Sequence, residues 1–77
     1  MDLRGAMVIA KNYITYGEPN ATLGSFEPLK GVYNEKNSRW EITCRYEVGY
    51  GSEKRIRTAR VTIDNEKGQI LAFEVLS

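Results

Sequence analysis

The sequence has no histidine and only one cysteine, Cys44, and both scarcities limit the chemistry it can support. Covalent catalysis usually pairs a nucleophile with histidine, and transition-metal sites are built mainly from histidine and cysteine. Acid–base work would fall to Asp or Glu, but several of these carboxylates are predicted in loops, where charges are normally solvated. Glycine-rich phosphate loops are also missing. The sequence therefore predicts a protein that is not an enzyme, holds no metal or other cofactor and has no evident small-molecule ligand.

A lone cysteine also excludes an intramolecular disulfide bond. Small extracellular domains often depend on such bonds, so this composition favours a reducing compartment, with Cys44 as a small buried hydrophobe. The first residues, Met1 to Met7, lack the apolar core of a signal peptide, and no stretch is apolar enough over the length needed to span a bilayer. We therefore expect a cytoplasmic protein without membrane contact.

Charge of one sign does not dominate either, because the 77 residues carry a formal net charge of +1. Such a value gives no overall attraction to nucleic acid or anionic membranes. The sequence is 42% hydrophobic and 27% charged, which is ordinary for a globular chain. Its length suits a single domain over residues 1–77.

An amphipathic helix is predicted near the N-terminal end of the sequence. Asp2 can cap a helix that begins at Leu3, and Gly17 can end it. Apolar residues recur at the spacing of one helical face: Leu3, Ala6, Met7, Ala10 and Ile14. Arg4 and Lys11 lie on the other side and are too few for a membrane-surface helix, so the stripe is interpreted as core.

A connecting segment over residues 17–28 is rich in glycine and proline, and a first strand is predicted from Leu29 to Asn34. Either Val32 or Tyr33 is expected to point inward. Pro28 lacks the N–H group that a central strand needs, so this strand should lie at an edge of the sheet.

Alternation with period two dominates the second half of the sequence. The first apolar set comprises Trp40, Ile42, Cys44, Tyr46, Val48 and Tyr50; the second comprises Ala59, Val61 and Ile63; the third comprises Leu71, Phe73 and Val75. Each set is typical of a strand with one buried face. Trp40 is expected to be the anchor of the core.

Two turn sequences set the register of these strands. Gly51-Ser52 fits a two-residue hairpin loop, and Glu66-Lys67-Gly68 fits a three-residue loop with a left-handed glycine that pairs Ile63 with Leu71. Both registers bring the apolar side chains to one face. We therefore predict an α+β fold, in which the N-terminal helix packs on one face of a three- to four-stranded antiparallel meander sheet.

The run Arg60 to Leu71 resembles the hairpin of PepSY-type domains, because Asp64 ends a strand and a short polar turn reaches Gly68 before an aliphatic strand. The strand from Trp40 to Val48 is similar in style, so the resemblance spans Arg39 to Leu76. PepSY-type domains are small α+β modules, commonly exported or membrane-associated, and thought to regulate or inhibit partner proteins. The resemblance implies a helix-on-sheet fold and brings no catalytic residues. The sequence departs from the family's usual setting in lacking an export signal.

The sheet face turned away from the helix is expected to be mixed, with the apolar residues Ile70, Ala72 and Leu76 among threonines and arginines. An apolar strip on such a face can mark a protein contact, and an exposed strand edge can accept another strand. We therefore predict a small interaction or regulatory module that binds a protein partner or itself, as a dimer, through this face or a sheet edge. The predicted contact residues are Arg45, Arg57, Arg60, Ile70 and Leu76.

Weak nucleic-acid binding is the alternative prediction. Arg45, Arg57 and Arg60 would contact phosphates on a basic sheet surface, beside aromatic residues that could stack on bases. Alternation, however, sends Arg57 and Arg60 to opposite faces. Glutamates interleave with the cations and are expected to pair with them across strands. Partner binding is therefore the preferred hypothesis.

Overall fold

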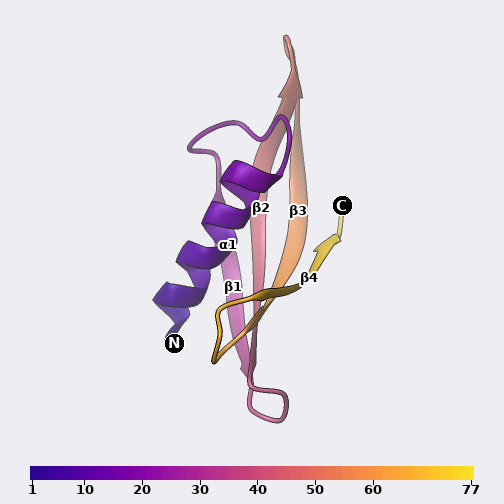
Figure 1. The fold of residues 1–77 in the computed structure, drawn as a ribbon. Helices are drawn as coiled ribbons and strands as arrows, with labels where there is room; N and C mark the ends of the chain where they lie inside the picture. Colours follow the sequence, from indigo (N-terminus) through magenta and orange to yellow (C-terminus); the bar gives the residue numbers. More distant parts are fainter.

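The computed structural model describes residues 1–77, including every side chain except that of Tyr50. Its elements are α1 (Leu3–Gly17), β1 (Glu27–Asn34), β2 (Arg39–Tyr50), β3 (Glu53–Asp64) and β4 (Ile70–Val75). The strands form one antiparallel sheet in the order β1-β2-β3-β4, and α1 lies across one face of it (Figure 1). The predicted α+β fold, an N-terminal helix on an antiparallel meander, is confirmed.

Helix α1 has the bounds that its capping residues indicate. The Asp2 carboxylate accepts a hydrogen bond from the Gly5 N–H at 2.8 Å, which satisfies one of the donors left free at a helix start. At the other end the Glu18 N–H donates to the Ile14 carbonyl at 3.1 Å. The fully buried residues of the helix are Ala6, Ala10 and Ile14. Two of these three are alanines, so the helix can approach the sheet closely.

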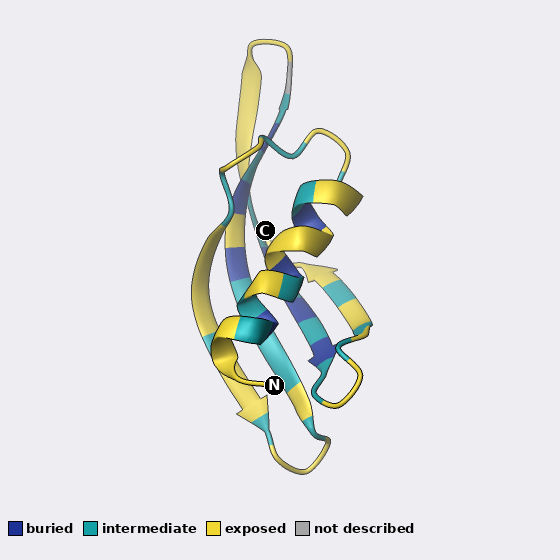
Figure 2. Ribbon diagram, turned by 60° about the vertical axis from the view of Figure 1, so that its left-hand side comes forward, coloured by how far each residue is buried: buried dark blue, intermediate teal, exposed yellow. Residues whose placement is uncertain are grey.

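The core lies between α1 and the middle of β2 and β3, where the buried residues in Figure 2 are concentrated. Ile42 pairs with Val61 and Cys44 with Ala59, so the register set by Gly51-Ser52 is confirmed. We call the face covered by α1 the inner face and the opposite one the outer face. The buried side chains of both strands belong to the inner face, as the period-two pattern predicts.

Trp40 is not the anchor of this core, so that prediction is wrong. Its side chain is only partly buried, its indole N–H donates to Asn65 Oδ1 at 2.9 Å, and its ring lies 5.1 Å from that of Tyr33. Tyr33 is thus the inward residue of β1, whereas Val32 pairs with Glu41 on the outer face. Trp40 closes one end of the core, and the largest fully buried side chain is Tyr46.

Strand β4 departs from the predicted register at its start. Val75 pairs with Ala59 and Phe73 with Val61 as expected, but a β-bulge brings Ile70 opposite Ile63. A bulge places two residues of one strand against one residue of its neighbour, which reverses the side-chain order beyond it. Ile70 consequently packs against the core, whereas Leu71 is 43% exposed. The prediction that Ile70 points away from the helix is therefore wrong.

The turn that leads into β4 has the predicted left-handed glycine but not the predicted three-residue length, because the Asp64 N–H donates to the Gln69 carbonyl at 2.9 Å. Gly68 has φ +70°, in the left-handed region that favours glycine, and its N–H donates to the Asp64 carbonyl at 2.9 Å. The Asp64 carboxylate also accepts the Lys67 N–H at 2.7 Å. The turn therefore holds its shape by hydrogen bonds of its own.

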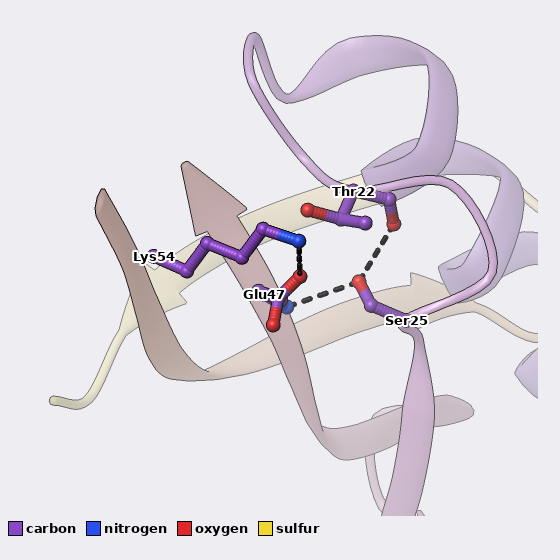
Figure 3. Close-up of polar contacts among 4 residues, drawn as sticks. All are labelled: Thr22, Ser25, Glu47 and Lys54. Carbon is purple, nitrogen blue, oxygen red and sulfur yellow. Dashed lines mark hydrogen bonds and ion pairs between the residues drawn. The ribbon is translucent and has the colours of Figure 1, made fainter. Parts of the chain in front are cut away.

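The loop between α1 and β1 is fastened to β2 rather than free. The Thr22 N–H donates to the Glu47 carbonyl at 2.8 Å, and the Gly49 N–H donates to the Asn20 carbonyl at 3.1 Å. Ser25 Oγ accepts the Glu47 N–H at 3.0 Å and donates to the Thr22 carbonyl at 2.7 Å (Figure 3). These bonds extend the sheet beside β2 past the start of β1, so the loop has a fixed position.

Strand β1 lies at the edge that Pro28 indicates, and Gly31 is its point of closest approach to α1. A Cβ atom on Gly31 would lie 2.2 Å from Leu3 Cδ1 and 3.2 Å from Ile42 Cδ1. We expect Gly31→Ala to lower the free energy of unfolding by about 1 kcal/mol, since the end of the exposed Leu3 side chain must move and Ile42 Cδ1 is also close. Urea denaturation measures this.

Gly17→Ala is the matched control for that substitution, because a Cβ at Gly17 meets nothing within 4 Å. A helical alanine is also intrinsically preferred to glycine. The control should therefore be neutral or stabilising. Equal stabilities for Gly31→Ala and the unsubstituted protein would contradict the close packing of Leu3 on β1.

Candidate protein-interaction surface

The structure does not bring the predicted contact residues onto one surface. Arg45 and Arg60 alternate with buried residues and lie on the outer face, whereas Arg57 pairs with Tyr46 and belongs to the inner face. Ile70 packs against the core. Leu76 is exposed just beyond β4, where its N–H donates to the Thr58 carbonyl at 2.7 Å. Only part of the predicted set can therefore contact one partner.

Each of the three arginines already has a glutamate partner. The Arg45 guanidinium lies 2.6 Å from the Glu27 carboxylate, that of Arg57 lies 2.8 Å from Glu18, and Arg60 pairs with Glu74. The two exposed pairs, Arg45 with Glu27 and Arg60 with Glu74, contribute little stability, about 0–1 kcal/mol each. All three pairs do, however, cancel the local positive charge. A phosphate would have to compete with a carboxylate at every one of these positions.

The outer face is hollowed beside β4 into an open groove of about 760 Å³. Its walls carry charges of both signs, including Arg39, Glu41, Arg60 and Glu74, while Leu71 and Ala72 contribute apolar surface. Within the part of the chain that the structure describes, His, Cys, Asp and Glu nowhere gather in a group of three or more that could hold a metal ion. The groove is a mixed, shallow surface rather than a site shaped for one small molecule.

The exposed edge of the sheet at β4 differs in composition from the edge at β1. Edges are commonly protected from unwanted pairing by proline, lysine and bulges. β1 has all three, since Pro28 and Lys30 flank a bulge. β4 has a bulge only at its start, and from Leu71 to Leu76 its single charge is Glu74. Among the described strands none pairs with the far side of β4.

Exposed apolar side chains accompany this free edge. Leu71, Val75 and Leu76 are all large, hydrophobic and exposed. The Phe73 ring lies 5.3 Å from that of Tyr13, which carries the apolar surface onto α1. We call these five residues the β4 edge patch. In the sequence, the alternation pattern assigns Leu71 and Val75 to the core. The sequence feature that indicates the patch is a nearly uncharged run without proline at the end of the sequence.

Strand β4 also leaves part of its neighbour uncovered. Hydrogen bonds from β4 and the two residues after it reach only Thr58 of β3, and the hairpin of β2 and β3 continues well past both β4 and α1 (Figure 1). The residues of β3 from Glu53 to Ile56 are all exposed. A strand added along β4 would therefore reach the point where β4 ends and β3 continues. The end of the added strand could lie against this uncovered part of β3.

Cys44 has no features of a reactive thiol. It is fully buried, its thiol donates to the Ala59 carbonyl at 3.6 Å, and burial raises its pKa from 9.0 to about 11. A nucleophilic cysteine requires the opposite shift, because the thiolate is the reactive form. The interpretation of Cys44 as a core residue agrees with this position.

The raised pKa of Cys44 predicts a loss of stability at alkaline pH. Between pH 9.0 and about 11 the thiol loses its proton in the unfolded chain but keeps it in the folded one. The free energy of unfolding should therefore fall across this interval. Urea denaturation of the unsubstituted protein and of Cys44→Ala at several pH values measures the part due to this thiol. Parallel pH dependences of the two proteins would contradict the assignment.

Comparisons with models of protein families, with curated proteins and with solved structures find no match to this chain, so the PepSY-type resemblance stays a prediction. No helix in the described residues is both long and apolar enough to cross a membrane.

Proposed function

We propose that this protein is a small, non-enzymatic interaction module that associates through its β4 edge patch, and that the strand it accepts is β4 of a second copy. The observation that carries the proposal is the contrast between the two sheet edges. Pro28, Lys30 and a bulge protect β1, whereas β4 exposes apolar side chains beside unpaired backbone groups. Adding a strand at β4 would satisfy those groups and bury the apolar side chains together.

A second copy suits this edge because the β4 sequence is complementary to itself when two strands run antiparallel. If the two-fold axis passes near Phe73, Leu71 of one copy faces Val75 of the other and Glu74 faces Ala72. No pair of like charges meets, and the contact is of the isologous kind found in two-fold dimers. The two sheets would join into one continuous sheet.

The size of the contact sets the expected affinity. β4 contains six residues, so the interface is small and the dimer should be reversible, with a dissociation constant on the order of micromolar. Sedimentation velocity over a concentration series should show a monomer–dimer equilibrium. A monomer throughout the series, up to millimolar concentration, would reject self-association.

The surroundings of the module follow from the same residues. We place it in the cytoplasm, because a single buried thiol suits a reducing compartment. Nucleic-acid binding ranks second, since Arg45, Arg57 and Arg60 are divided between two faces and paired with glutamates. Within this proposal the module works without a cofactor.

A further inference from the structure

A second surface, on the opposite flank of α1 from the β4 edge patch, combines apolar side chains with positive charge. Met7 and Val8 of α1 face Phe26 and Pro28 across a groove of about 240 Å³, and Arg4 and Lys11 complete its lining. This volume is below the roughly 300–1,000 Å³ typical of small-molecule pockets. The groove therefore suits a few side chains of a partner rather than a whole cofactor. We call it the α1–β1 groove.

The two cations of this groove differ from the arginines of the sheet in having no counter-charge. Arg4 and Lys11 are exposed, and neither takes part in the ion pairs found among the described side chains. They are seven residues apart, which on a helix means the same side and a separation of about 10 Å along the axis. Val8 lies between them and is 51% exposed. Two uncompensated positive charges thus flank an apolar strip.

Strand addition is disfavoured at this groove, so a ligand must bind mainly through side chains. Pro28 has no N–H to offer a neighbouring strand, and the bulge beside it interrupts the regular spacing of backbone groups. An amphipathic helix that inserts its apolar face between two elements meets this condition.

We propose that the α1–β1 groove binds an acidic amphipathic helix of a partner protein. Carboxylates seven residues apart on that helix match the spacing of Arg4 and Lys11, because both pairs repeat over two helical turns. Apolar residues three and four positions after the first carboxylate fall between the charges. They enter the groove against Val8 and Phe26. This second surface does not depend on self-association at β4, so one protein could join a copy of itself to a partner.

The probe is a blocked synthetic peptide of about 16 residues with high helix propensity, two glutamates seven apart and two leucines between them. Two control peptides replace the glutamates by lysines or the leucines by serines. Titration into ¹⁵N-labelled protein should shift the amide resonances of Val8 and Phe26 with the acidic peptide, and raised salt should weaken binding. The control peptides should bind at least about tenfold more weakly.

Charge reversal in the protein gives the decisive comparison. The double variant Arg4→Glu/Lys11→Glu should lose about tenfold or more in affinity for the acidic peptide and gain affinity for the lysine peptide. Both side chains are exposed, so the variant should fold. The matched control, Lys36→Glu/Lys67→Glu, removes two exposed cations from turns elsewhere and should bind like the unsubstituted protein.

Three results would overturn the groove proposal: no binding of the acidic peptide, equal affinity for all three peptides, or amide shifts confined to residues outside the groove. The same titration on a Leu71→Lys variant separates the two surfaces. Groove binding should persist there whether or not the protein forms dimers.

Discussion

Replacing Tyr46 by alanine is expected to unfold the protein, whereas replacing it by phenylalanine is expected to leave the fold at least as stable. Tyr46 is 1% exposed and is the largest of the fully buried side chains. Truncation of a buried aromatic residue costs about 3–5 kcal/mol. A domain of this size has a total stability of the same order, so the alanine variant should have little or no folded population.

Phenylalanine should be tolerated because the Tyr46 hydroxyl contributes no hydrogen bond that its removal would break. Among the described side chains it is buried without a partner in hydrogen-bond geometry. Burial, followed by the negative charge of Glu18, raises the pKa of Tyr46, and the nearby Arg57 guanidinium lowers it. Arg57 is engaged with Glu18 at 2.8 Å and lies outside hydrogen-bond geometry to the Tyr46 hydroxyl. Removing an unpaired buried polar group should raise stability by up to about 1 kcal/mol.

Circular dichroism and urea denaturation, followed by the fluorescence of the partly buried Trp40, measure both variants. A phenylalanine variant that is less stable by more than about 1 kcal/mol would show that the hydroxyl has a partner, such as a bound water. An alanine variant with nearly unchanged stability would contradict the central position of Tyr46. The two results bear on different atoms of one side chain, so each can be judged alone.

The contrast between Tyr46 and Trp40 shows what alternation alone can and cannot predict. Both residues belong to the same apolar set of β2, and the pattern correctly places both on the inner face. Their depth of burial depends on where α1 crosses the strand. That crossing is a matter of tertiary packing, and Ala6, Ala10 and Ile14 place it over the middle of β2 and β3. Trp40, which has the larger of the two side chains, therefore lies at the end of the core.

The error at Ile70 has a different origin. Ile70 and Leu71 are both aliphatic, so a strand that starts at either residue gives an acceptable apolar pattern. The turn decides between them, because the Asp64 N–H donates to the Gln69 carbonyl and Ile70 therefore lies opposite Ile63, with the bulge after it. By contrast, the helix was predictable to its bounds because its signals are local: a carboxylate at the cap, a stripe at helical spacing and a glycine near the end.

The candidate surfaces were predictable only in part for the same reason. The sequence correctly assigns Arg57 and Arg60 to opposite faces, because alternation is a local property. It cannot show that Glu18, in the distant loop, pairs with Arg57. The α1–β1 groove likewise exists only because Phe26 packs beside α1, so Arg4 and Lys11 in the sequence indicate no more than a polar helix side.

Lysine substitutions in the β4 edge patch should disrupt the proposed dimer with little effect on the monomer. Leu71→Lys and Val75→Lys each place a charge where two β4 strands would meet. Burying such a charge without a partner is costly, and lysine is a common guard of exposed strand edges. We expect the dissociation constant of the dimer to rise at least about 100-fold in the double variant. Sedimentation velocity measures the change.

Val32→Lys is the matched control, because Val32 and Leu71 are both 43% exposed but lie on opposite edges of the sheet. It should leave the dimer intact. Urea denaturation at low protein concentration should give similar stabilities for all variants, since exposed substitutions usually change stability by less than about 0.5 kcal/mol. Amide hydrogen exchange adds a direct readout: β4 should gain protection as the unsubstituted protein is concentrated, and β1 should not. Equal dissociation by Val32→Lys, or protection gained at β1 instead, would assign the contact to the other edge and refute the role of β4.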